Sequence, residues 1–187
     1  DHHRCSMTWT IRAATEADAA PCAAIYARYV TETAITFEIE PPDAAEMGQR
    51  IATAAATHAW LVLEDAGVVV GYAYGRPFHQ RAAYRWASET SIYLDMNRRR
   101  TGAGRALYSA LLDRLAERGY RRALGGMTLP NEGSAGLHRA LGFTPKAAEA
   151  YARDQKIFLR RQRMGRNRPM SYGHAFNHWW DRFGQAH

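Results

Sequence analysis

A glycine-containing loop between a strand pattern and a helix pattern is the feature that most constrains the fold. The loop, Arg99-Arg100-Thr101-Gly102-Ala103-Gly104, follows an alternating apolar run that ends at Leu94 and precedes an amphipathic stretch that begins near Arg105. Glycines let backbone N–H groups approach an anion closely, and a helix start adds unpaired N–H groups and a positive dipole end. The arginines add permanent positive charge. This order predicts a phosphate cradle, and an ordinary turn with a solvated basic rim is the alternative.

The length and composition are those of a single domain with a buried core. A chain of 187 residues buries roughly two thirds of the surface that it exposes when unfolded. No apolar run approaches the ~20 residues of a membrane-spanning helix, and the first residues lack the layout of a signal peptide, so we expect a cytoplasmic protein. The two cysteines, Cys5 and Cys22, have no second pair or histidine cluster around them, so no metal site is predicted.

The spacing of apolar residues predicts helices and strands around one sheet, which is an α/β fold. Helices are expected over about 21–31, 43–57, 105–118 and 133–141. Strands are expected over about 8–13, 60–63, 68–74, 84–94 and 122–128, with a hairpin turn at Asp65-Ala66-Gly67. Residues 1–6 are interpreted as leader or expression-derived residues.

Several motifs occur in a fixed order along the chain. They are the strand 84–94, the loop Arg99-x-x-Gly102-x-Gly104, the break 129–131, the segment 137–143 and the N-terminal segments 11–18 and 37–41. Together they resemble the GNAT superfamily of N-acetyltransferases, and within it the branch that acetylates phosphinothricin, methionine sulfone and methionine sulfoximine. The match covers about residues 7–145. It implies one domain with a mixed, mostly antiparallel central sheet flanked by helices.

The resemblance also implies an activity. Such an enzyme moves the acetyl group of acetyl-CoA to the α-amine of a small amino-acid-like acceptor by direct attack, and it needs no metal. By the same analogy the chain forms a homodimer. A different amine is the alternative acceptor, such as another amino acid, a polyamine or a protein N-terminus.

The resemblance assigns the cofactor-binding residues. The pyrophosphate of acetyl-CoA is expected on the loop and helix start formed by Arg99, Arg100, Thr101, Gly102, Ala103, Gly104 and Arg105. The pantetheine arm is expected to pair with the main chain of Ile92, Tyr93 and Leu94, whose N–H groups would polarise the thioester carbonyl. Asn131 would hold the same arm, and a simple turn residue after proline is its alternative.

Three side chains are candidates for the chemistry. Glu89 interrupts a strand suited to burial and is the candidate general base for the acceptor ammonium, because partial desolvation raises a carboxyl pKa. An exposed glutamate paired with a nearby arginine is its alternative. His138 is a candidate auxiliary base or substrate contact, and Tyr108 a candidate proton donor to the leaving thiolate. For both, a structural role in the core is the alternative.

Further residues are expected to bind the acceptor. The resemblance places basic and aromatic side chains in the loop before the long strand, at His79, Arg81 and Tyr84, with Phe37 as an apolar wall. Thr90 and Ser91 on the strand itself complete the expected set. Arg81 can form a bidentate pair with a phosphinate or carboxylate, whereas His79 is a weaker, pH-dependent cation.

The C-terminal segment 146–187 departs from the family pattern. It contains nine lysine or arginine and three aspartate or glutamate residues, so it carries +6 of the formal net charge of +7. Its aromatic end suggests a segment that completes the sheet or a dimer contact. Arginines interleaved with aromatic residues are also typical of single-stranded nucleic-acid binding, although a solvated basic face is the ordinary explanation. Nucleic-acid binding is therefore kept as a less favoured alternative function.

Overall fold

The centre of the sheet is an apolar hairpin followed by a third antiparallel strand. The computed structural model describes residues 9–33, 35–36, 38–80, 82–98, 102–128, 132–145 and 177–183. Strands β2 (Ala59–Asp65) and β3 (Val68–Pro77) are joined at Ala66 and Gly67, which both have positive φ. Two such residues form the turn whose twist matches that of a hairpin, so the predicted turn lies where the sequence puts it. β4 (Ala87–Leu94) pairs with β3 from Ser88 to Leu94.

Within the described residues, seven strands form one mixed sheet in the order β1-β2-β3-β4-β5-β7-β6. The outer strands are β1 (Trp9–Ala13), β5 (Arg122–Thr128), β7 (Asn177–Phe183) and the two-residue β6 (Thr144–Pro145). Among these strands only the neighbours β4 and β5 run parallel. The predicted mixed, mostly antiparallel sheet is confirmed.

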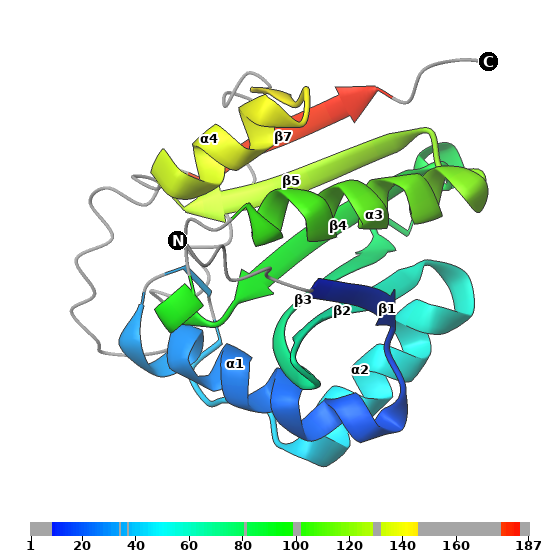
Figure 1. Ribbon diagram of the computed structural model, residues 1–187. Helices are drawn as coiled ribbons and strands as arrows, with labels where there is room; N and C mark the ends of the chain where they lie inside the picture. Colours follow the sequence, from blue (N-terminus) through cyan, green and yellow to red (C-terminus); the bar gives the residue numbers. More distant parts are fainter. Residues whose placement is uncertain are drawn as a thin grey trace, which may run out of the picture.

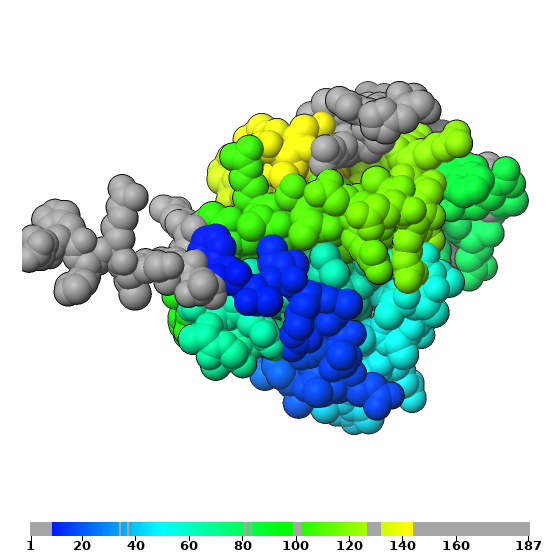
Figure 2. Space-filling model, turned by 45° about the vertical axis from the view of Figure 1, so that its right-hand side comes forward, coloured from blue at the N-terminus to red at the C-terminus, as the bar shows by residue number. Residues whose placement is uncertain are grey.

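Helices cover both faces of the sheet (Figure 1). On one face, α1 (Ala19–Glu32) and α2 (Ala44–Thr57) bury Tyr26, Met47 and Ile51 against aromatic residues of the sheet. On the other face, α3 (Ala103–Glu117) packs its leucines against β2 and β3. The shorter α4 (Glu132–Ala140) lies beside α3, and Figure 2 shows α3 as a green band between the yellow α4 and the blue N-terminal elements.

The long strand predicted over 84–94 is shorter in the structure. A single turn of 3₁₀ helix covers Ala82–Tyr84, and the Arg85 N–H donates to the Ala82 carbonyl at 3.2 Å. Strand geometry begins only at Ala87, after this turn. The alternating pattern continues through the turn, so periodicity alone could not separate the two.

The C-terminal segment contributes strand β7 to the sheet. β7 pairs antiparallel with the whole of β5 and, on its other side, with β6. The chain between Pro145 and Asn177, which holds eight of the nine basic residues of the segment 146–187, lies outside the described residues. In the part of the chain that the structure describes, no helix is long and apolar enough to cross a membrane.

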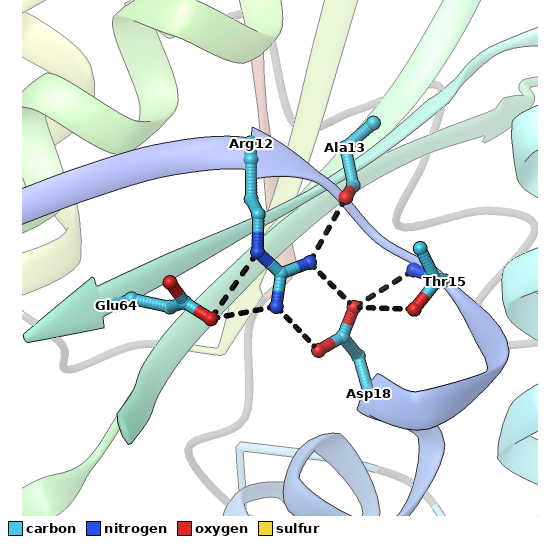
Figure 3. A network of polar contacts seen from close by, with 5 residues as sticks. All are labelled: Arg12, Ala13, Thr15, Asp18 and Glu64. Carbon is cyan, nitrogen blue, oxygen red and sulfur yellow. Dashed lines mark hydrogen bonds and ion pairs between the residues drawn. The ribbon is translucent and has the colours of Figure 1, made fainter. Parts of the chain in front are cut away.

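An ion-pair network joins β1, β2 and the residue that precedes α1 (Figure 3). Arg12 on β1 donates to Glu64 on β2 at 2.7 Å and makes two hydrogen bonds of 2.8 Å to Asp18. The Asp18 carboxylate also accepts the Thr15 N–H at 2.7 Å and is only 3 % exposed. The hydrogen bonds from Arg12 hold the pKa of Asp18 below its usual value. The buried carboxylate of Asp18 therefore has hydrogen-bond donors from both Arg12 and Thr15 at the point where β1 leads into α1.

Replacing this acid should therefore destabilise the fold. We expect Asp18→Asn to lower the free energy of unfolding by about 1–3 kcal/mol at pH 7, because Arg12 and Thr15 lose a charged partner. The lowered pKa stabilises the folded state above the unfolded value of about 4, and this is lost as pH falls through the folded-state pKa. The difference between the two proteins in urea unfolding should accordingly shrink below about pH 4.

Glu32→Gln is the matched control, because Glu32 forms an exposed pair with Arg28 on α1. Its effect should stay within about 0.5 kcal/mol. Equal losses in the two variants, or a difference that does not change with pH, would contradict the assigned role of Asp18.

Candidate active site

The parallel strands β4 and β5 separate halfway along their length. Their pairing runs from Ala87 opposite Arg122 to Thr90 opposite Gly125 and ends there. β4 continues to Leu94 against β3, whereas β5 continues to Thr128 against β7. The sheet therefore opens after Thr90 and Gly125, and β4 presents a strand edge that β5 no longer covers.

Main-chain groups of β4 point into this opening. Asp95 donates its N–H to Val70 on β3 at 2.8 Å. Successive residues of a strand direct their N–H and C=O groups to alternate sides, so those of Ile92 and Leu94 point away from β3. The Leu94 carbonyl accepts the Tyr29 hydroxyl at 2.6 Å. Ile92, two residues beyond the last pair with β5, is thus placed to pair with an extended ligand or to donate to an oxyanion.

The start of α3 lies next to this strand edge. Gly102 precedes the helix with φ of +82°, a backbone conformation that favours glycine, and no side chain caps the helix there. The Ala106 N–H makes the first helical bond, to Gly102, so the N–H groups before it point outward. A Cβ on Gly104 would lie 3.0 Å from Leu94, so glycine lets α3 approach β4 closely. An uncapped helix N-terminus beside an open strand edge suits a ligand with an anionic part and an extended arm.

Not every residue of the expected cradle is described. Arg99, Arg100, Thr101 and Asn131 lie outside the described residues. Ala103 is buried against the sheet and Arg105 is exposed on the first turn of α3. The described part of the loop therefore has the predicted strand, glycine and helix order.

Glu89 is paired with an arginine that the sequence analysis did not single out. Arg76 lies directly opposite on β3 and donates to the two carboxylate oxygens at 2.9 and 3.1 Å. The Glu89 side chain is 16 % exposed and that of Arg76 is 56 % exposed. Glu89 raises the pKa of Arg76 above its usual value. The carboxylate thus lies mostly buried on the α1/α2 face of the sheet, with one cation fixed against it.

The next residue points to the other face. The Thr90 hydroxyl lies 2.5 Å from the Tyr108 hydroxyl and 3.3 Å from the Leu124 carbonyl. The Tyr108 hydroxyl lies 3.2 Å from Nε2 of His138. The expected acceptor contact Thr90 and the expected proton donor Tyr108 therefore meet on the α3 face, away from Glu89.

His138 is buried where α4 packs on the sheet. Its Nδ1 lies 2.7 Å from the Ser134 carbonyl, and its ring makes edge contacts with Tyr108 and Phe143. Burial lowers the pKa of His138, so the neutral imidazole is favoured. The rings of Tyr108 and His138 pack in the core, as expected if both residues have a structural role. Their polar atoms, however, form one hydrogen-bonded chain with Thr90.

The expected acceptor residues are only partly described. His79 and Tyr84 are exposed and their rings lie 5.0 Å apart, next to Phe78. Ser91 is half-buried on the face that carries Glu89, directly opposite Tyr74 of β3. Phe37 and Arg81 lie outside the described residues.

Two arginines near this face were missed by the sequence analysis. Arg76 is brought to Glu89 by the register of β3 and β4, which the hairpin pattern could have indicated. Arg50 on α2 donates to Glu38 at 2.5 and 3.1 Å and so fixes the segment before α2. No sequence pattern indicates the contact between Arg50 and Glu38, because it depends on how α2 packs on the rest of the fold. Among the described residues, no group of three or more acidic, histidine or cysteine side chains could hold a metal ion.

A mixed sheet that opens between two parallel strands, followed by an uncapped helix N-terminus, defines the class of protein. It is an acetyltransferase domain of the GNAT type. The family described as "Acetyltransferase (GNAT) domain" matches residues 11–156, and the chain belongs to this family.

Characterised relatives are similar over most of the chain. Phosphinothricin N-acetyltransferase of Streptomyces viridochromogenes is 35 % identical over 136 residues, which are 73 % of this chain and 74 % of the relative. The L-methionine sulfoximine/L-methionine sulfone acetyltransferase of Salmonella typhimurium is 33 % identical, over 74 % of this chain and 81 % of the relative.

A solved structure supports the same relationship. The phosphinothricin acetyltransferase of Sinorhizobium meliloti, solved in complex with acetyl-CoA, superposes with a TM-score of 0.78 at 32 % identity. The alignment covers 96 % of this chain and 91 % of that one. The predicted family and branch resemblance are confirmed.

A substitution at Gly125 tests whether the buried contact between Tyr108 and His138 affects stability and activity. A Cβ on Gly125 would lie 2.4 Å from His138 Nε2 and 3.2 Å from the Tyr108 hydroxyl, so the imidazole must move. We expect Gly125→Ala to lower stability by about 1–3 kcal/mol and to reduce acetyl transfer. Thermal unfolding and a thiol-release assay measure the two effects.

Gly136→Ala on α4 is the control, because nothing lies within 4 Å of its added Cβ. It should leave stability unchanged or raise it by up to about 1 kcal/mol. If Gly125→Ala behaves like this control, the close packing of His138 on β5 is wrong.

Proposed function

We propose that this GNAT N-acetyltransferase moves the acetyl group of acetyl-CoA to the α-amine of a small amino-acid-like acceptor of the phosphinothricin, methionine sulfone or methionine sulfoximine type. The observation that carries the proposal is the separation of β4 from β5, which begins one residue after the mostly buried Glu89. The names of the relatives at 33–35 % identity support the acceptor class.

Acetyl-CoA supplies the acetyl thioester in this proposal. The opening between β4 and β5 is its binding site, with the uncapped start of α3 on the pyrophosphate and Ile92 on the pantetheine arm. The Ile92 N–H then donates to the carbonyl oxygen of the thioester and stabilises the negative charge that develops there. The described residues fit such a ligand because both the strand edge and the helix start offer N–H groups to the same region.

Glu89 is the general base. The acceptor ammonium must lose a proton before it can attack, and the carboxylate accepts that proton directly or through a water. Arg76 keeps the carboxylate in a fixed orientation through two hydrogen bonds. The exposed rings of His79 and Tyr84, together with Phe37, Arg81 and Ser91, form the acceptor side of the site.

Tyr108 is the proton donor to the leaving sulfur. Its hydroxyl turns from His138 Nε2 to the sulfur. Its O–H bond then breaks as the S–H bond forms, and the phenolate regains a proton from solvent. The acceptor ammonium loses two protons on becoming an amide, of which one ends on the thiol and the other in solvent. His138 contacts Tyr108 and not Glu89 in the described structure, so we assign it to this half of the reaction.

Other acceptors remain a second candidate function. The L-amino acid N-acyltransferase of Escherichia coli is 34 % identical over 74 % of this chain. A ribosomal-protein-alanine N-acetyltransferase of Brucella melitensis superposes with a TM-score of 0.76 at 28 % identity. A free amino acid or a protein N-terminus is therefore the competing acceptor.

We further propose that the enzyme is cytoplasmic and forms a homodimer.

Acetyl transfer by Glu89→Gln tests the reaction and the base together. Thiol release from acetyl-CoA is measured with methionine sulfone, methionine sulfoximine, phosphinothricin, unmodified amino acids and a peptide with a free N-terminus. We expect kcat with the preferred acceptor to fall about 10²–10⁴-fold in the variant, because the amide cannot accept the proton. KM for acetyl-CoA should change little, since Glu89 lies on the opposite face from α3.

Glu117→Gln is the control, because Glu117 forms an exposed pair with Arg114 at the end of α3. It should keep the activity of the unmodified chain. Full activity in Glu89→Gln would contradict the proposed role of Glu89 as the base. A preference for the peptide would contradict the proposed acceptor class and favour a protein N-terminus.

A further inference from the structure

Three side chains form a continuous hydrogen-bonded chain from β4 to α4. Thr90 lies 2.5 Å from Tyr108, which lies 3.2 Å from His138. Thr90, Tyr108 and His138 are all buried, at 2 %, 0 % and 3 % exposure. Hydroxyl and imidazole groups can each donate or accept, so the direction of the chain depends on where its hydrogens lie.

The far end of the chain fixes that direction. Nδ1 of His138 lies 2.7 Å from the Ser134 carbonyl, which can only accept, so Nδ1 carries a hydrogen. In a neutral ring Nε2 is then an acceptor, and the Tyr108 hydroxyl donates to it. The Tyr108 oxygen is left to accept, and among the described residues the hydroxyl close enough to donate to it is that of Thr90.

Thr90 has a second acceptor, the Leu124 carbonyl, at the longer distance of 3.3 Å. One hydroxyl hydrogen cannot serve both partners at once. The shorter contact to Tyr108 favours donation to the phenol oxygen. The arrangement therefore gives Tyr108 a fixed donor from β4 as well as a fixed acceptor on α4.

This contact lies where the sheet opens. Thr90 and Gly125 form the last pair between β4 and β5, and Ile92 is the next residue of β4 on the same face. Gly125 has no side chain, which leaves the space that Tyr108 and His138 occupy. The hydroxyls of Thr90 and Tyr108 thus meet at the inner end of the opening.

We propose that Thr90 is a positioning residue for acetyl transfer, which holds the Tyr108 hydroxyl at the inner end of the opening and stabilises its phenolate by a hydrogen bond. This role differs from the contact with the acceptor that the sequence predicts for Thr90. The inference rests on the proposed role of Tyr108 as the proton donor.

The electrostatics of Tyr108 support this role. Burial raises the pKa of the phenol above its usual value, and the hydrogen bond from Thr90 lowers it. A donor that stabilises the phenolate makes the phenol a stronger acid. Without the Thr90 hydroxyl, Tyr108 would be buried with nothing from β4 to offset the burial, and it would release its proton less readily.

A double-mutant cycle tests the inference. Thr90→Val keeps the shape of the side chain and removes the hydroxyl, and Thr90→Ser keeps the hydroxyl. We expect Thr90→Val to lower kcat about tenfold with little change in either KM, and Thr90→Ser to restore most of it. In a Tyr108→Phe background, Thr90→Val should cause no further loss of kcat, because its partner is already absent.

Ser88→Ala is the matched control. Ser88 is a fully buried hydroxyl two residues earlier on the same face of β4, and it lies 3.3 Å from the Arg76 carbonyl. It should keep the kcat of the unmodified chain. Thermal unfolding of each variant separates loss of folded protein from loss of rate.

The outcomes distinguish the inference from the proposed function. If Tyr108→Phe lowers kcat but the Thr90→Val loss is absent, or adds in full to that of Tyr108→Phe, the positioning role of Thr90 is overturned and the donor role of Tyr108 stands. If Tyr108→Phe has full activity, both are overturned. A tenfold loss that serine restores and that vanishes in the Tyr108→Phe background supports the inference.

Discussion

The separation of β4 from β5 is the constraint on which the rest of the site depends. β4 keeps its antiparallel partner β3 as far as Leu94, and β5 is fully paired with β7, so neither strand needs the other beyond Thr90 and Gly125. The opening therefore leaves each diverging strand with one paired edge. Because side chains alternate along β4, Glu89 and Thr90 enter the site from opposite faces of the sheet at adjacent residues. The proposed base for the amine and the proposed proton donor for the leaving group can then lie close to one another without touching.

Two glycines make this arrangement sterically possible. Gly104 allows α3 to approach Leu94, and this brings the helix N-terminus to the open strand edge. Gly125 leaves room for the His138 ring, which would otherwise be displaced from Tyr108. Of the two, only Gly104 belongs to a motif that the sequence analysis singled out. The role of Gly125 depends on a helix that packs over the strand from further along the chain.

The local elements of the fold could be predicted from the sequence, whereas several decisive contacts could not. The hairpin at Ala66 and Gly67, the strand before the loop and the helix after it all follow from patterns within about 15 residues. The pairing of Arg76 with Glu89 depends on the register of two strands, and the pairing of β7 with β5 joins residues 49 to 61 positions apart in the chain. The side of the sheet to which Thr90 points also depends on strand register. The contact between Thr90 and Tyr108 therefore could not be predicted from the sequence. The candidates Arg99, Arg100, Thr101, Asn131, Phe37 and Arg81 lie outside the described residues and stay predictions.

The two candidate bases can be separated by what surrounds them. His138 is buried on the α3 face, its Nδ1 is bound to a carbonyl, and its Nε2 faces the Tyr108 hydroxyl. Burial lowers its pKa, so an added proton would be unfavourable there. Glu89 lies on the other face, still partly exposed, and its only described ionic partner is a more exposed arginine. A proton taken from a solvated ammonium can be passed on to water from Glu89 more easily than from a histidine enclosed by Tyr108 and Phe143. The geometry therefore supports the proposal of Glu89 as the base for the amine, and of His138 as the partner of the tyrosine that we propose protonates the leaving sulfur.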